Sequence, residues 1–152
     1  MRISAKADYA VRAAVELAAA APGHPLKGEH MASAQAIPTK FLENILVDLR
    51  QAGIVQSRRG PDGGYWLARP AAQVTVADVI RASDGPLASV RGEKPEDLAY
   101  DGAATELRQV WIALRASMRD VLEGVTLADL AAGTLPGEIT QRTAEPGAWA
   151  RR

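Results

Sequence analysis

The sequence predicts a mainly α-helical fold with one small β-hairpin, and three observations predict it. Apolar residues recur at helical spacing in the first half of the chain. A turn rich in Gly, Pro and Asp at residues 59–64 separates two short β-prone runs. A seven-residue repeat of apolar side chains then marks a long helix in the second half. The 152 residues suit one domain, or a small domain with an added arm.

Composition narrows the class of protein. The 18 Lys and Arg balance the 18 Asp and Glu, but residues 1–83 carry a balance of +3 and residues 84–152 a balance of −3. A mildly basic first half is compatible with binding phosphates. The absence of cysteine excludes disulfides, thiolate metal sites and cysteine nucleophiles. No run approaches the ~20 apolar residues that span a bilayer, so we expect a cytoplasmic protein with no membrane partner.

The first two helices are marked by their ends. Ser4 can cap a helix that runs to about Ala20 and presents one apolar face of small residues. The segment 21–23, Ala-Pro-Gly, ends it. A second, short helix is expected between Lys27 and Ala36.

The third helix, from about Thr39 to Ala52, has the clearest pattern. Pro38 lies where it begins and Gly53 ends it as a C-terminal cap. One stripe is expected to face a core, namely Phe41, Leu42, Ile45, Leu46 and Leu49. The opposite side carries Lys40, Glu43, Asn44, Val47 and Arg50.

A hairpin and a fourth helix follow. Residues 54–58 and 65–68 are β-prone, and the turn between them places Arg58 and Arg59 at the tip. The pattern Thr75 to Asp78 is typical of a capping box and opens a helix that ends near Ser83.

The second half holds an acidic loop, a long helix and a tail. Residues 84–102 are polar and acidic, and a helix of about 21 residues, ~31 Å long, is expected from about Ala103 to Glu123. Thr126 and Asp129 repeat the capping pattern for a short final helix, and residues 133–152 are expected to form a flexible tail. The apolar repeat and its flanking residues are Leu107, Val110, Trp111, Leu114, Met118, Val121, Leu122 and Val125.

The long helix has two interpretations. Its apolar seam could pack onto its own domain. Its length exceeds what a compact domain of 80 residues needs to cover, which favours pairing with a second copy. Readers of two-fold symmetric DNA also need such an arm, because their half-sites lie about 34–36 Å apart. The seam is therefore interpreted as a dimerisation surface.

The order of three helices and an arginine-tipped hairpin is typical of a winged helix-turn-helix DNA-binding domain. A recognition helix needs a polar outer face and an inner face held by a core, and residues 39–52 meet both conditions. Lys40, Asn44 and Arg50 can donate to phosphates or bases, while Glu43 can accept from a cytosine amino group. An arginine on a narrow turn suits the minor groove. The alternatives are a solvated helix face and a flexible surface loop.

Several segments at matching spacing resemble the Rrf2 family of bacterial transcription regulators, which includes the IscR and NsrR types. They are Met1-Arg2-Ile3-Ser4, Tyr9-Ala10-Val11, residues 37–43 (Ile-Pro-Thr-Lys-Phe-Leu-Glu) and residues 59–65 (Arg-Gly-Pro-Asp-Gly-Gly-Tyr). The resemblance extends to about residue 131 and implies a homodimer with a winged head and a long dimerisation helix.

The resemblance also implies site residues. Glu43, with Thr39 and Lys40, lies in the base-reading part of the recognition helix, and Arg59 lies at the wing position that enters the minor groove. The first helix contributes backbone contacts. With the residues proposed from chemistry, the DNA-contacting set is Ser4, Lys6, Tyr9, Lys27, Thr39, Lys40, Glu43, Asn44, Arg50, Arg58, Arg59 and Gly60.

The departure from the family concerns the cofactor. Cluster-binding members hold an iron–sulfur cluster with three cysteines in the loop before the long helix, and here residues 91–103 contain neither Cys nor His. Asp8 lies where some relatives recruit a carboxylate, which does not make such a site without thiolates. The loop carboxylates match no calcium-binding loop, and His24 and His30 lack spaced partners for zinc. We expect no cofactor, no metal and a cluster-free branch of the family.

The sequence thus predicts a DNA-binding transcription regulator, a repressor of a pseudo-palindromic operator, with an unidentified small-molecule or protein effector. The alternative is a protein-interaction module on a winged-helix scaffold, and an enzyme is not expected because no catalytic set is recognisable. The predicted organisation is a DNA-binding domain at 1–83, an acidic loop at 84–102, dimerisation and terminal helices at 103–132, and a tail at 133–152.

Overall fold

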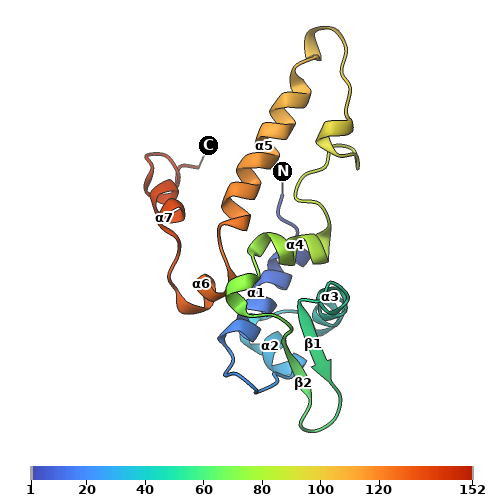
Figure 1. The fold of residues 1–152 in the computed structure, drawn as a ribbon, viewed down its shortest axis with the longest axis vertical. Coiled ribbons are helices and arrows are strands. Elements are labelled where there is room, and N and C mark those ends of the chain that lie inside the picture. Colours follow the sequence, from blue (N-terminus) through green and yellow to red (C-terminus); the bar gives the residue numbers. More distant parts are fainter. Residues whose placement is uncertain (1, 152) are drawn as a thin grey trace.

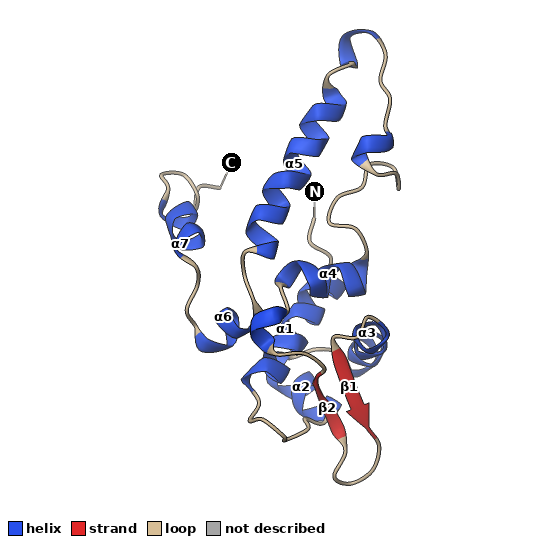
Figure 2. Cartoon of the chain, in the orientation of Figure 1, coloured by secondary structure: helices blue, strands red, loops and turns tan. Residues whose placement is uncertain are grey.

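The structure is a computed structural model that describes residues 2–151, so that Met1, the first residue of the predicted family motif, and Arg152 lie outside the described residues. Figure 1 shows a head made of helices and a hairpin, from which one long helix projects. The mainly helical fold with one β-hairpin is confirmed, as Figure 2 shows by its colours. The first half contains α1 (Ala5–Ala19), α2 (Gly28–Gln35), α3 (Thr39–Gln51), β1 (Val55–Arg58), β2 (Gly64–Leu67) and α4 (Val76–Asp84).

The ends of these elements follow from their caps. The Ser4 hydroxyl accepts a hydrogen bond from the Ala7 amide at 3.0 Å and begins α1. The capping box of Thr75 and Asp78 is present at the start of α4. Such caps satisfy amides that have no partner within the helix, which is why the predicted starts of α1 and α4 agree with the structure.

The hairpin is antiparallel, with Val55 opposite Leu67 and Arg58 opposite Gly64. Its second strand has a further partner that was not predicted from the sequence. The Leu26 amide donates to the Tyr65 carbonyl at 2.9 Å, and the Tyr65 amide donates to the Leu26 carbonyl at 2.8 Å. The link between α1 and α2 therefore protects the outer edge of β2 and fixes the hairpin to the head.

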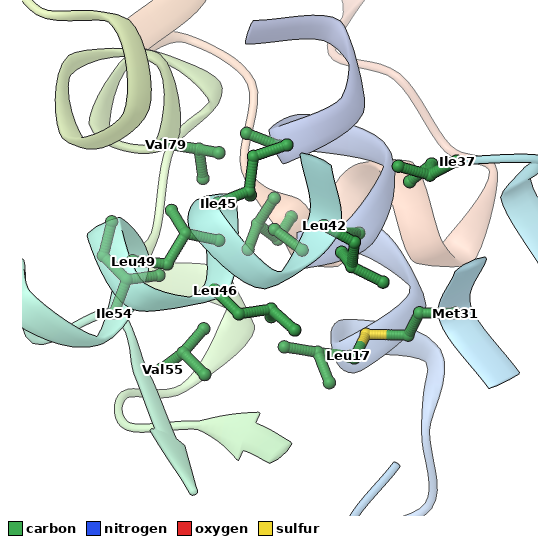
Figure 3. Packing of buried hydrophobic residues seen from close by; sticks show 14 of the residues in the cluster. Leu17, Met31, Ile37, Leu42, Ile45, Leu46, Leu49, Ile54, Val55 and Val79 are labelled. Carbon is green, nitrogen blue, oxygen red and sulfur yellow. The ribbon is translucent and has the colours of Figure 1, made fainter. Parts of the chain in front are cut away.

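The core of the head lies between α1, α3 and α4 (Figure 3). Four residues of the predicted α3 stripe are buried in it, namely Leu42, Ile45, Leu46 and Leu49. The prediction for Phe41 is wrong, because its side chain is 48% exposed. The four aliphatic side chains already fill the inner face of α3, and Phe41 lies at its border, with its ring edge-on to Tyr9 of α1 at 5.9 Å.

The chain returns to the head after the long helix. The short helix α6 (Leu127–Ala132) packs against α1, and Leu127 is part of the head core. The Val76 amide donates to the Val125 carbonyl at 3.0 Å, which joins the start of α4 to this returning segment. The assignment of Val125 to the dimerisation seam is therefore wrong, because Val125 lies beyond the long helix and is buried in its own chain.

The long helix α5 (Leu107–Glu123) is shorter than predicted. A 3₁₀ turn at Gly102–Ala104 replaces its expected first turn, so α5 has 17 residues and is about 26 Å long. The loop before it contains a second 3₁₀ turn, η2 (Pro95–Asp97), and runs back along α5 (Figure 1). We call residues 85–124 the arm. Within residues 2–151, no helix is both long enough and apolar enough to cross a membrane.

The predicted tail at residues 133–152 contains a helix that was not predicted from the sequence. Residues 137–144 form a helix, α7 (Gly137–Ala144), and its side chains are largely exposed. Pro136 precedes the first turn, and the Trp149 indole N–H donates to the Thr143 carbonyl at 2.7 Å. The last carbonyls of a helix need partners outside it, and the Trp149 indole supplies one of them for α7.

The second capping box gives a testable pH dependence. Hydrogen bonds from the Thr126 amide and hydroxyl, both 2.8 Å long, hold the pKa of Asp129 below its usual value of 3.8. A carboxyl group whose pKa is lower in the folded state stabilises that state above its unfolded pKa, and the effect is lost as the pH falls through the folded value. Asp129→Asn should therefore lower the melting temperature at pH 7, and the difference from wild type should be smaller at pH 2, below the usual pKa of an aspartate.

Circular dichroism melts at the two pH values measure this effect. The control is Asp120→Asn on the exposed surface of α5, since Asp120 makes no side-chain hydrogen bond within residues 2–151. An Asp129→Asn variant with the wild-type melting temperature at pH 7 would contradict the assigned role of this cap.

Candidate nucleic-acid interface

The outer face of α3 is free for contacts. Thr39, Lys40, Glu43, Asn44 and Arg50 are all exposed, whereas the inner face of the same helix is held by the core. The predicted division of α3 into a buried and an exposed side is therefore confirmed apart from Phe41. A helix held in this way presents its outer side chains in a fixed orientation, as reading of a groove requires.

The tip of the hairpin is a narrow turn that depends on glycine. A Cβ atom on Gly63 would lie 2.0 Å from the Arg58 carbonyl oxygen, and Gly60 has a φ of +105°, which favours glycine. The Arg58 guanidinium donates to the Asp62 carbonyl at 3.2 Å. Arg59 is exposed, and its side chain makes no hydrogen bond or ion pair within the described part of the chain.

Lys27 connects the hairpin tip to the start of α2. Its ammonium group donates to the Gly60 carbonyl at 2.8 Å. The Arg50 guanidinium likewise donates to the Ser57 hydroxyl at 3.2 Å, joining the end of α3 to β1. Two basic side chains, one just before α2 and one on α3, therefore hold the hairpin beside α3.

These contacts surround a cleft of about 340 Å³ between α2, α3 and the hairpin. Four of its lining residues are basic, and none is acidic. The cleft is a positively charged part of this face of the head, since Lys27, Arg50, Arg58 and Arg59 converge on it. All four residues were predicted individually from the sequence, but their convergence depends on the fold.

The predicted residues of α1 have other contacts. Ser4 caps the helix, and the Lys6 ammonium lies 2.7 Å from an Asp48 carboxylate oxygen on α3. Tyr9 is half-buried between the Phe41 ring and the Arg12 guanidinium, which lies 4.7 Å from the Tyr9 ring centre. These contacts position α1 against α3, so that Lys6 and Tyr9 lie close to the recognition helix.

Arg12 is a positioning residue that sequence reasoning missed. Its guanidinium donates to the Gln35 carbonyl at 2.8 Å at the end of α2 and lies 3.0 Å from an Asp8 carboxylate oxygen. It thereby holds the turn between α2 and α3. Asp8 at i and Arg12 at i+4 is the spacing of a helical ion pair, which was the available signal.

The predicted seam residues of α5 are not buried within the single chain. Val110 is 54% exposed, and Trp111 is half-buried with its indole N–H donating to the Tyr100 hydroxyl at 3.1 Å. Part of the helix therefore packs on its own loop and another part lies against α4, while the side chain of Val110 remains mostly exposed. The half-buried members are Leu107, Trp111, Leu114, Met118, Val121 and Leu122.

The donor set does not fit an iron–sulfur cluster. The chain has no cysteine, and within residues 2–151 no group of three or more His, Asp or Glu side chains could hold a metal ion. Asp8, the position of a carboxylate ligand in some relatives, is paired with Arg12. Iron–sulfur clusters are held mainly by thiolates, so the residues present do not support binding of a cluster by this chain.

A buried helical core, an exposed recognition helix and a basic hairpin cleft together define a winged helix-turn-helix transcription regulator that binds DNA. The sequence profile of the Rrf2 family, described as iron-dependent transcriptional regulators, matches residues 3–133. The chain belongs to the Rrf2 family, whose members are regulators and not enzymes.

Relatives and solved structures agree with this assignment. The HTH-type transcriptional regulator Rv1287 of Mycobacterium tuberculosis is 56% identical over 141 residues, which cover 93% of this chain and 88% of the relative. The structure of CymR, the global cysteine regulator of Bacillus subtilis, has a TM-score of 0.74 and 32% identity over 88% of this chain and 98% of CymR. IscR of T. potens has a TM-score of 0.69 and 29% identity over 99% and 97%.

Proposed function

We propose that the chain is a repressor that binds a pseudo-palindromic operator as a homodimer and carries no iron–sulfur cluster of its own. The basic cleft between α3 and the hairpin is the observation that carries this proposal. Its four cations can neutralise phosphates on the two sides of a groove. The exposed face of α3 then lies where base edges are read in the major groove.

The residues have separate roles in this proposal. Lys40, Asn44 and Arg50 donate to phosphates or bases, and Glu43 selects cytosine by accepting from its amino group while repelling phosphate. Arg59 enters the minor groove, and Lys27 and Arg58 hold the hairpin that presents it. Thr39 lies beside Lys40 and Glu43 in the base-reading part of α3. Ser4, Lys6 and Tyr9 lie at the edge of the same face and contact the DNA backbone.

The apolar seam of α5 supports dimerisation, because its side chains are exposed or only half-buried in the single chain. The apolar side chains of α5 would pair with those of a second copy around a two-fold axis. Two heads joined in this way match a palindromic operator, in which half-sites lie about one helical turn apart.

The test measures binding to the DNA upstream of the protein's own gene by fluorescence anisotropy at several salt concentrations, against scrambled DNA. Wild type should prefer the upstream DNA by at least ~10³-fold. Arg59→Ala should cost about 1–3 kcal/mol of binding free energy. Glu43→Ala should reduce the preference for the correct sequence more than it reduces affinity.

Two matched controls accompany these variants. Arg69→Ala removes an exposed arginine beyond the other end of β2, and Gln51→Ala changes an exposed residue at the end of α3. Both should bind as wild type does. Equal and salt-sensitive binding to both DNAs, with no effect of either test substitution, would contradict the proposal and favour a protein-interaction module.

A further inference from the structure

A second cavity lies between the head and the arm, on the far side of α4 from the hairpin. It has a volume of about 290 Å³ and is lined by residues 86–88, Glu96 and four basic residues. Arg81 comes from α4, Lys94 from the arm loop, and Arg115 and Arg119 from α5. This concentration of positive charge contrasts with the net charge of −3 on residues 84–152.

Two glutamates of the chain already occupy part of this positive environment. The Arg115 guanidinium donates to the Glu96 carboxylate, and the Arg81 guanidinium donates to the Glu123 carboxylate. Arg119 Nε also donates to the same Glu123 oxygen, at 3.2 Å. The two carboxylates show where the arginines hold oxyanions.

Both glutamates are ionised at neutral pH. The pKa of Glu96 is held below its usual value of 4.5, mainly by a hydrogen bond from the Glu96 backbone and next by the hydrogen bond from Arg115. The hydrogen bond from Arg81 lowers the pKa of Glu123 in the same direction. The side chains of Glu96 and Glu123 are nevertheless 47% and 37% exposed, and ion pairs at such exposure are weak enough to be exchanged for another anion.

The positive charge exceeds what these glutamates neutralise. Four cations face two carboxylates, and Lys94 makes no ion pair within the described residues 2–151. Arg115 is the least exposed of the paired arginines, with 25% of its side chain accessible. A guanidinium fork binds carboxylate and phosphate groups with two parallel hydrogen bonds, so the cavity is chemically suited to a ligand with more than one such group.

We propose that this cavity binds a small molecule with two oxyanion groups, a dicarboxylate or a diphosphate, that displaces Glu96 and Glu123 from the arginines. Its volume of about 290 Å³ is just below the usual range for small-molecule sites, about 300–1,000 Å³, which limits the ligand to a small one. Arg81 belongs to the head, whereas Lys94, Arg115 and Arg119 belong to the arm, so the bound ligand bridges the two.

The consequence for regulation rests on the proposed function. If α5 pairs two heads, the angle between α4 and α5 sets the separation of the two recognition helices. A dianion that bridges Arg81 and Arg115 then stabilises one angle between α4 and α5, and hence one separation of the two recognition helices. Operator affinity changes by as much as the dianion binds that arrangement more tightly than the others. The binding event itself requires neither DNA nor a second copy.

Isothermal titration calorimetry of the full chain tests the site directly, with succinate and inorganic pyrophosphate as probes and acetate at the same ionic strength as control. Succinate, pyrophosphate or both should give a saturable heat, and acetate none. Arg115→Gln and Lys94→Gln should each weaken the binding by roughly tenfold or more, as expected for loss of a charge-assisted hydrogen bond. Arg108→Gln, which removes an exposed arginine of α5 outside the cavity, should leave it unchanged.

Lys94→Gln keeps the test independent of folding, because Lys94 has no ion pair in residues 2–151 to lose. Absence of saturable heat with both probes, or equal binding by Arg115→Gln and Arg108→Gln, overturns the site. Dianion binding by a chain that does not distinguish operator from scrambled DNA overturns the proposed function and leaves the site standing. Dianion binding that leaves operator affinity unchanged overturns its regulatory role.

Discussion

Leu46→Ala is expected to lower the free energy of unfolding by about 2–5 kcal/mol, as found for large-to-small changes in close-packed cores. Leu46 is 2% exposed and packs in the core among side chains of α1, α3 and the hairpin (Figure 3). The core is poor in aromatic residues, so aliphatic side chains of this kind supply most of its contacts. Chemical denaturation followed by circular dichroism measures the change.

Val47→Ala is the matched control on the neighbouring residue of the same helix. Val47 is 41% exposed, and its truncation should change stability by no more than about 0.5 kcal/mol, as is usual for surface substitutions. Equal effects of the two substitutions would show that α3 does not bury the side that the structure assigns to the core.

Val110→Glu is expected to raise the dissociation constant of the proposed dimer by at least roughly 100-fold. The substitution places a carboxylate in each copy of an apolar seam, and removal of an unpaired charge from water costs several kcal/mol. Each 1.4 kcal/mol corresponds to a factor of ten in the constant. Analytical ultracentrifugation over a concentration series measures the change.

Ala116→Glu adds the same charge on the opposite, exposed side of α5 and should leave the dimer intact. The Val110→Glu chain should also retain its helical circular dichroism, since Val110 makes no buried contact in the single chain. A wild-type chain that sediments as a monomer at every concentration would contradict the assignment of α5 to dimerisation.

Local signals account for the part of the fold that the sequence predicted. Ser4, Thr75 and Thr126 each begin a helix through a hydrogen bond within three residues, so these starts can be read from neighbouring letters. The turn at residues 59–64 is likewise a local property of its glycines and proline. The family resemblance also followed from short motifs at fixed spacing and is confirmed by the profile match.

The incorrect predictions, for Val125 and Phe41, concern local sequence patterns that are compatible with two different structures. The apolar repeat continues through Val125, but the helix ends at Glu123 and the chain turns back into the head. Spacing alone does not reveal that return. Phe41 belongs to the apolar stripe of α3 by its position, yet its side chain is 48% exposed and packs on Tyr9 of α1.

The candidate site depended still more on distant parts of the chain. Lys27, Arg50 and Arg59 were named one at a time from residue type, position and resemblance. Their common cleft exists because β2 pairs with Leu26 and because Lys27 reaches the Gly60 carbonyl. Neither contact can be predicted from the periodicity of the sequence, since each joins segments more than thirty residues apart.

The return of the chain through Val125 and Leu127 affects how the protein folds during its synthesis. The head is discontinuous in sequence, because its core is completed by Leu127 only after the entire arm has been translated. Until then α1 has an uncovered side where α6 later packs. Ribosome-bound chains that end before residue 125 should hold an incomplete, aggregation-prone head, so the DNA-binding unit is completed only after Leu127 has been synthesised.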